Sequence, residues 1–306
     1  MADILKTILP VVLMLIIGVV ARKGNMLSRE GINGMKKVVV NITLPAVMLN
    51  AFASMTYTFE NVLVTLIMFA VCFVAWLFGA LLSGNKGFLA FLTTGFEAGM
   101  LGYALFTLAY GGDRISTFAA VDLGQVLFVF TVYKALLGKK SGGGMSAKQM
   151  VLEMVKSPVI IAIAVGVILG ATGLYQAMTV QGSAAVLDAC TDFISAPTSA
   201  MILITIGYDL ELKNTPWKAV AKVVVCRILI MAALRFVTGL VIHLTPLGTS
   251  LDQALNIMFI LPAPYVLPVF ADDENERSFV SSSLSVLTLI SIVAFFILVI
   301  VSAGGL

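Results

Sequence analysis

One acidic residue lies in the middle of a long apolar stretch. Glu97 stands among three glycines, Gly95, Gly99 and Gly102. A carboxylate at the centre of a bilayer costs about 2.5–3.5 kcal/mol on insertion scales, so such residues usually face a cavity and serve function. We predict that Glu97 is an ion-coupling carboxylate that binds a proton or a cation. The alternative is a structural pair with a buried arginine.

A second stretch has three prolines within seven residues, Pro262, Pro264 and Pro268, with Tyr265 between them. Proline removes a main-chain donor and clashes with the preceding turn, so this stretch should unwind. Unwound main chain at membrane depth survives only where protein buries it or a water-filled cavity adjoins it. Helix N-termini at such breaks favour an anion. The predicted substrate-binding residues are Asn50, Gly95, Glu97, Gly99, Gly102, Gln125, Pro262, Pro264, Tyr265 and Pro268.

Further polar residues lie inside apolar runs. Asp122 and Gln125 are one helical turn apart and share a face, so they either close the site or form an interhelical hydrogen bond. Asp192 is predicted to reach a cavity as an ion-coupling residue, whereas Asp188 is expected to be exposed. Arg227 is a candidate clamp for a carboxylate, because guanidinium binds carboxylates bidentately, and its alternative is a buried pair with an acid.

The composition sets the environment in which these residues act. Of 306 residues, 60% are hydrophobic and 11% are charged, against about 25% charged in a soluble chain. One membrane span needs about 20 apolar residues. The sequence therefore predicts an all-α polytopic membrane protein. Its ten apolar runs are 4–21, 35–54, 61–83, 87–110, 115–137, 155–173, 183–207, 216–243, 252–271 and 278–303.

The same composition excludes several binding functions. A net charge of +3 without clustered basic residues argues against nucleic-acid binding. One histidine and three widely spaced cysteines leave little material for a metal site, so we expect neither metal nor cofactor.

The basic residues predict the orientation of the chain. Fourteen fall on one side of the predicted spans and only Lys6 and Arg114 on the other. Basic loops are typically cytoplasmic, so both termini are predicted to be extracellular or periplasmic, in a cytoplasmic (inner) membrane. The fourteen are Arg22, Lys23, Arg29, Lys36, Lys37, Lys86, Lys134, Lys139, Lys140, Lys148, Lys156, Lys213, Lys218 and Arg277.

The two halves of the chain share a pattern. A polar linker, residues 138–154, separates five predicted spans in 1–137 from five in 155–306. Pro10 and Gly18 enclose seven apolar residues in span 1, and Pro158 and Gly166 do the same in span 6. Chance similarity of apolar helices is the alternative, but a Pro in spans 2 and 7 also matches. Halves with odd span numbers must be inverted, and inverted repeats are typical of secondary transporters.

These motifs resemble the auxin efflux carrier family, which includes plant PIN-type auxin exporters and bacterial malate and malonate permeases. The similar stretches are residues 41–49, which contain Leu-Pro-Ala, residues 97–104, and the spacing of Pro262 and Ala271. The resemblance implies the crossover fold of sodium/proton antiporters and bile-acid symporters. In that fold, spans 4 and 9 break and cross, and a mobile transport domain moves against a scaffold.

The resemblance also implies an organic anion as substrate, with span 8 in the scaffold, which favours a buried acid as the partner of Arg227. Two departures stand out: Glu97 replaces the family's usual Asn, and Ala104 replaces its usual Pro. We therefore predict a secondary transporter of a small organic anion, such as malate, malonate or an auxin-like acid. Glu97 and Asp122 are its candidates for proton coupling.

The main alternative is a sodium-coupled carrier of the bile-acid symporter type. An intramembrane aspartic protease would need Asp113 and Asp209 together, and they fall at opposite membrane faces. A receptor would need neither an inverted repeat nor broken helices. We therefore expect no enzyme activity, and a homodimer is left open.

Overall fold

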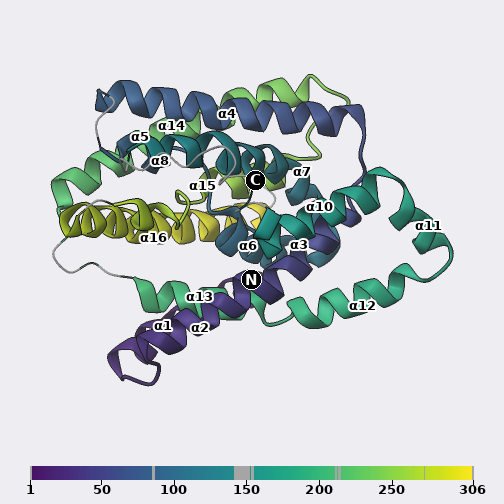
Figure 1. The fold of residues 1–306 in the computed structure, drawn as a ribbon, viewed down its shortest axis with the longest axis horizontal. Helices are drawn as coiled ribbons and strands as arrows, with labels where there is room; N and C mark the ends of the chain where they lie inside the picture. The colour runs from purple at the N-terminus through teal and green to yellow at the C-terminus, as the bar shows by residue number, and fades with distance from the viewer. Residues whose placement is uncertain are drawn as a thin grey trace. The chain divides into compact units, whose positions relative to one another are not determined.

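The computed structural model describes residues 2–84, 87–140, 152, 155–210, 212, 215–271 and 273–304, and their regular structure is helical (Figure 1). The chain divides into two compact units. Unit 1 comprises Met1–Asn61, Gly99–Ala120 and Val151–Asp209, and unit 2 comprises Val62–Ala98, Val121–Met150 and Leu210–Leu306. Each unit takes segments from both predicted halves. Most of the predicted linker 138–154 lies outside the described residues.

Seven described helices are long and apolar enough to cross a membrane. An eighth span results if the bent pair α10 (Pro158–Ala171) and α11 (Leu174–Val180), with 67° between the helices, is counted as one. These correspond to eight of the ten predicted runs. The other two, 87–110 and 252–271, are interrupted, so ten spans stay a prediction. The seven helical spans are Ile4–Lys23, Arg29–Ala53, Phe59–Ser83, Gly112–Lys140, Ala184–Asp209, Trp217–His243 and Glu274–Ser302.

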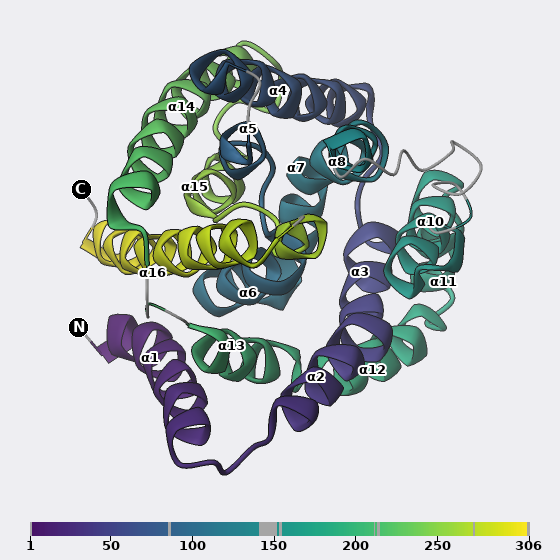
Figure 2. The same ribbon diagram turned by 60° about the vertical axis from the view of Figure 1, so that its left-hand side comes forward.

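Unit 1 is organised around two close helix pairs, α1 with α13 and α3 with α10 (Figure 2). Its principal helices are α1 (Ala2–Lys23), α2 (Arg29–Val38), η1 (Val39–Thr43), α3 (Leu44–Ala53), α6 (Tyr103–Tyr110), α10, α11, α12 (Ala184–Ser195) and α13 (Thr198–Asp209). A β-carbon on Gly18 would collide with the main chain of α13, and one on Gly166 would lie 2.9 Å from the carbonyl of Leu49 in α3. Glycine is therefore required at these close approaches between the helices of each pair.

The second span of unit 1 begins earlier than its apolar pattern predicts. Ser28 caps α2, because its Oγ accepts a hydrogen bond of 3.0 Å from the N–H of Gly31. The helix continues through the π-turn η1, where the N–H of Leu44 bonds the carbonyl of Val39. Pro45 follows directly and has no N–H to donate. A π-turn is a known way to accommodate such a local loss of the helical ladder.

Unit 2 contains the whole of the interrupted run 252–271, the first part of the run 87–110 as far as Ala98, and the helices that pack around them. Its principal elements are α4 (Phe59–Ser83), α5 (Leu89–Leu92), α7 (Ile115–Phe128, shared with unit 1), η4 (Val129–Tyr133), α8 (Lys134–Lys140), α14 (Trp217–His243), α15 (Asp252–Ile260), η5 (Leu267–Phe270) and α16 (Glu274–Gly304). Helix α14 contacts α5, α15 and α16. Helix α14, which the resemblance assigns to a scaffold, thus lies in the same unit as the non-helical residues 93–97 and 261–266.

The long helices expose large apolar side chains. Leu81 in α4 is 70% exposed and Phe236 in α14 is 73% exposed. Apolar surface on this scale is unfavourable in water and suits the hydrocarbon of a bilayer. The chain is a multi-pass membrane protein.

Candidate functional site

Two non-helical segments in unit 2 form the centre of the candidate site. The first follows α5 and covers residues 93–97, before helix resumes in η2 (Ala98–Gly102). The second follows α15 and covers residues 261–266, before η5. A helix end leaves main-chain groups without helical partners, so buried breaks need other groups to bind.

Glu97 connects the two breaks by hydrogen bonds to main-chain groups that lie outside the helices. Its main-chain N–H donates to the carbonyl of Pro262 at 2.9 Å. Its carboxylate Oε2 accepts from the main-chain N–H of Tyr265 at 2.6 Å. One residue of the first break therefore binds both sides of the proline turn in the second, and the second bond is stronger when the carboxyl is ionised than when it is neutral.

Glycine is required at position 95 for two reasons. Gly95 has φ +68°, a left-handed conformation that other L-residues adopt at a cost. A β-carbon there would also lie 3.1 Å from Cγ of Pro264, tighter than ordinary contact. The left-handed turn thus brings the first break against the second.

Arg227 binds both breaks from α14. Its Nη1 donates to the carbonyl of Leu92 at 2.9 Å, and its Nη2 donates to the carbonyls of Gly95 at 2.7 Å and Leu261 at 2.8 Å. The side chain is buried, with 3% of the residue exposed, and it lies 5.9 Å from the ring centre of Phe96. The favoured prediction of an acid partner was wrong: these partners are main-chain carbonyls. The carboxylate-clamp role stays a prediction, and binding an anion through these two nitrogens would compete with the three bonds.

Other predicted site residues of unit 2 are held by hydrogen bonds. Asp122 and Gln125 are both buried on one face of α7, and Gln125 Nε2 donates to Asp122 Oδ1 at 3.1 Å, a bond within that helix; their predicted role in the site and an interhelical bond both stay predictions. The Gln125 Oε1 atom is buried without a hydrogen-bond partner in the described structure. The hydroxyls of Tyr265 and Thr288 lie 2.8 Å apart, which fixes the Tyr265 ring against α16. Pro268 lies in η5 and is partly buried.

Four predicted site residues belong to unit 1 instead. Asn50 donates from Nδ2 to Thr191 at 3.1 Å and to Asp188 at 3.4 Å, and Tyr175 also donates to Asp188 at 2.8 Å. Asp188 is therefore partly buried and engaged, and the expectation that it is exposed was wrong. Asp192 is exposed. Gly99 and Gly102 lie in η2. The structure does not test the roles predicted for these four residues.

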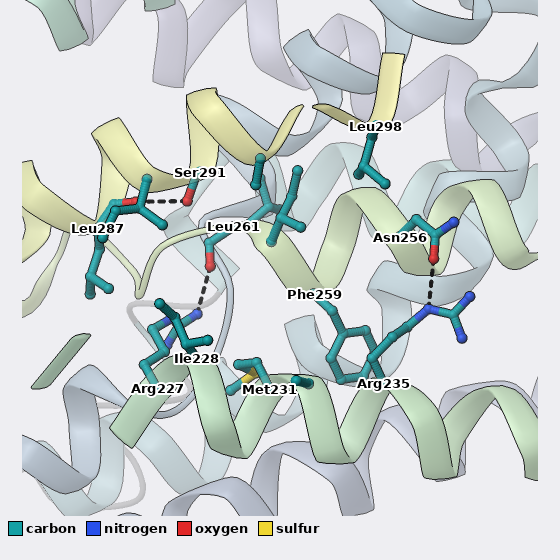
Figure 3. A pocket seen from close by; sticks show the side chains of 14 residues that line it. Arg227, Ile228, Met231, Arg235, Asn256, Phe259, Leu261, Leu287, Ser291 and Leu298 are labelled. Carbon is teal, nitrogen blue, oxygen red and sulfur yellow. Dashed lines mark hydrogen bonds between the residues drawn. The ribbon is translucent and has the colours of Figure 1, made fainter. Parts of the chain in front are cut away.

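A cavity of about 340 Å³ adjoins Arg227 between α14, α15 and α16 (Figure 3). Most of its wall is apolar, including Met231, Phe259 and Leu287. Arg227 and Leu261 lie at one end in Figure 3, while Arg235 and Asn256 lie together farther along, joined by a hydrogen bond of 2.8 Å. The volume is within the range of small-molecule pockets.

Sequence reasoning missed the carbonyls of Leu92 and Leu261 and the hydroxyl of Thr288. Main-chain carbonyls have no residue-type signature, because every residue has one. In the sequence, Thr288 is visible only as a hydroxyl residue within an apolar run. Such residues are common in membrane helices, so this one does not stand out. The cavity is also invisible in sequence, since ordinary apolar residues form its wall.

Comparison with known proteins places the chain in a family. The family described as membrane transport protein matches residues 3–302. No curated protein matches the sequence. The family match covers both interrupted segments and both compact units, and it agrees with the resemblance seen in the second, fourth and ninth apolar runs. The chain belongs to the membrane transport protein family, that of the auxin efflux carriers.

Proposed function

We propose that this membrane transporter is a secondary carrier of a small organic anion that works by alternating access and is coupled to protons. The observation that carries the proposal is the pairing of the two breaks by Glu97. Because this carboxylate holds the two helix breaks together, binding of a proton to it can change how readily the breaks separate. Spans 4 and 9, residues 87–110 and 252–271, are proposed to cross the membrane as broken helices.

Proton coupling follows from the chemistry of the bond between Glu97 and Tyr265. An ionised carboxylate accepts a hydrogen bond about twice as strongly as a neutral acceptor. Proton binding to Glu97 therefore weakens the 2.6 Å bond from the N–H of Tyr265 and favours separation of the breaks. Deprotonation restores the bond. Asp122, buried in the same unit, is proposed as a second proton-binding group.

The packing of unit 1 supports an inverted repeat. The glycines that match in the two halves, Gly18 and Gly166, have equivalent roles, because each lets the first helix of one half approach the second span of the other. The boundary between units also recurs in both halves, at Asn61/Val62 and at Asp209/Leu210. We propose five spans in each half, with both termini extracellular or periplasmic, in a cytoplasmic membrane.

Sodium coupling is the competing function, and Arg227 disfavours it. A sodium ion at unwound segments would need main-chain carbonyls. Three carbonyls of these segments and their helix ends, those of Leu92, Gly95 and Leu261, are bound by the guanidinium.

Transport assays in proteoliposomes test the proposal. Uptake of labelled mono- and dicarboxylates is measured with a proton gradient, with a sodium gradient, and with neither. We expect saturable uptake of at least one carboxylate that increases with the proton gradient and is unchanged when choline replaces sodium. Uptake that requires sodium would refute proton coupling, and absence of uptake across the carboxylate panel would refute the substrate class.

A further inference from the structure

We infer that Arg227 is a resident cation: its guanidinium occupies a carbonyl site at the two helix breaks that a mobile cation would otherwise fill. The inference deepens the proposed function, because it rests on the breaks being the transport site. Removing the side chain should leave a cation-binding site with preference for a planar, guanidinium-like ion.

The ligand set supports this role. The three carbonyls come from different places: the end of α5, the left-handed turn at Gly95, and the residue after α15. Their distances of 2.7–2.9 Å are typical of charge-assisted hydrogen bonds. Carbonyl oxygens that converge from separate segments carry partial negative charge and repel one another, so a cation is needed to hold them together.

A second arginine on the same helix shows the contrast. Arg235 is eight residues farther along α14 and forms an ordinary ion pair, with Nη2 at 2.9 Å from Oδ1 of Asp252. Its Nε donates to the side chain of Asn256. Arg235 therefore binds side chains at a partly exposed position, whereas Arg227 binds three main-chain carbonyls in a buried one.

The cavity beside Arg227 makes the inference testable. Because Arg227 lines a space of about 340 Å³, its truncation to alanine enlarges an existing cavity at the carbonyl site. Guanidinium has the donor geometry of the lost group, and urea has nearly the same shape without the charge. Met231 lies one turn along α14, is buried and lines the same cavity, so Met231→Ala removes volume without removing charge.

The experiment measures the apparent Tm of the purified full chain in detergent, with guanidinium chloride, urea or choline chloride at millimolar concentration. We expect Arg227→Ala to lower the Tm by roughly 6 °C or more, since it leaves three buried carbonyls unsatisfied. Guanidinium should restore about half of this loss or more, given site-specific stabilisation by a bound ligand. Urea and choline should restore none, and guanidinium should not stabilise Met231→Ala. Arg227→Lys should lower the Tm by less than Arg227→Ala does, because an ammonium keeps the charge and three donors.

Each outcome decides the inference without reference to transport. Equal rescue by urea and guanidinium, or rescue of Met231→Ala, would mean that the ligand only fills volume and would overturn it. A wild-type Tm in Arg227→Ala would overturn it as well. If Arg227→Ala does not fold, Arg227→Lys must be more stable than Arg227→Met, of similar length and no charge. The reverse order would refute the role of charge. Where uptake is measurable, guanidinium should also restore uptake by Arg227→Ala.

Discussion

Replacement of Glu97 by glutamine tests the proposed coupling most directly. Glutamine keeps the length and the acceptor oxygen, so the 2.6 Å bond from the N–H of Tyr265 can still form, but the charge is lost. A hydrogen bond to a charged group contributes about 1.5–3 kcal/mol and a neutral one about 0.5–1.5 kcal/mol, so the change is worth about 1 kcal/mol. This corresponds to roughly a fivefold shift toward separated breaks.

The assay is uptake of the preferred carboxylate in proteoliposomes over a series of external pH values. We expect wild-type uptake to depend on pH and Glu97→Gln to lose the greater part of that dependence, because the variant binds no proton at this position and only Asp122 of the two proposed groups remains. Its Tm should fall by no more than about 4 °C. Glu97→Asp keeps an ionisable group on a shorter side chain, so it should transport more slowly and remain dependent on pH.

Glu274→Gln is the matched control, because Glu274 is 85% exposed in the first turn of α16. It should keep the wild-type pH profile. A Glu97→Gln variant with the same pH profile as the wild type would refute the reasoning. Loss of the pH dependence in Glu274→Gln would show that the effect is not specific to the breaks.

Three stability predictions follow from the packing. Gly95→Ala should lower the stability of the protein in thermal unfolding by more than Gly84→Ala does. Both glycines have positive φ, which costs another residue about 1–2 kcal/mol, but Gly95 also lies against Pro264 of the other break, whereas Gly84 lies in open space. Equal losses of stability in the two variants would exclude the contact with Pro264. Gly18→Ala should lower the Tm, because its β-carbon would collide with α13. Gly34→Ala lies in open space on a helix and should raise the stability by up to about 1 kcal/mol. A Gly18→Ala variant with the wild-type Tm would contradict the close packing of α1 against α13. Tyr265→Phe should cost about 1 kcal/mol through the lost hydroxyl bond to α16, and an unchanged Tm would show that this bond contributes nothing.

The helices could be predicted from sequence where the local chemistry is decisive. A long apolar run such as that of α4 has one stable form in a bilayer, so its bounds agree within a few residues with the predicted 61–83. The Gly- and Pro-rich stretches around Glu97 and Pro264 were singled out because these residues weaken helical hydrogen bonding. The bend between α10 and α11 was missed. The bend lies at Gly173, which has a φ of +73°. The pattern of apolar residues around this glycine does not predict a bend.

The candidate site was less accessible to the same reasoning. The sequence places Arg227 inside an apolar run, and the family resemblance, which assigns span 8 to the scaffold, favours a buried acid as its partner. The structure supplies main-chain oxygens instead, and their convergence depends on where two distant segments end. Likewise Asp188 and Asp192 are one turn apart with similar surroundings in sequence. Only the tertiary contacts of Asn50 and Tyr175 distinguish the engaged residue from the exposed one.

The reliance on main-chain atoms at the breaks has an evolutionary consequence. In the hydrogen bonds described between the two segments, the side-chain atoms come from Glu97 and Arg227, while the partners are main-chain N–H and C=O groups, which most substitutions preserve. Positions such as Phe96 and Ala263 can therefore change without removing a hydrogen bond between the segments. A transporter built in this way can vary the side chains along its interrupted segments while the hydrogen bonds between those segments persist.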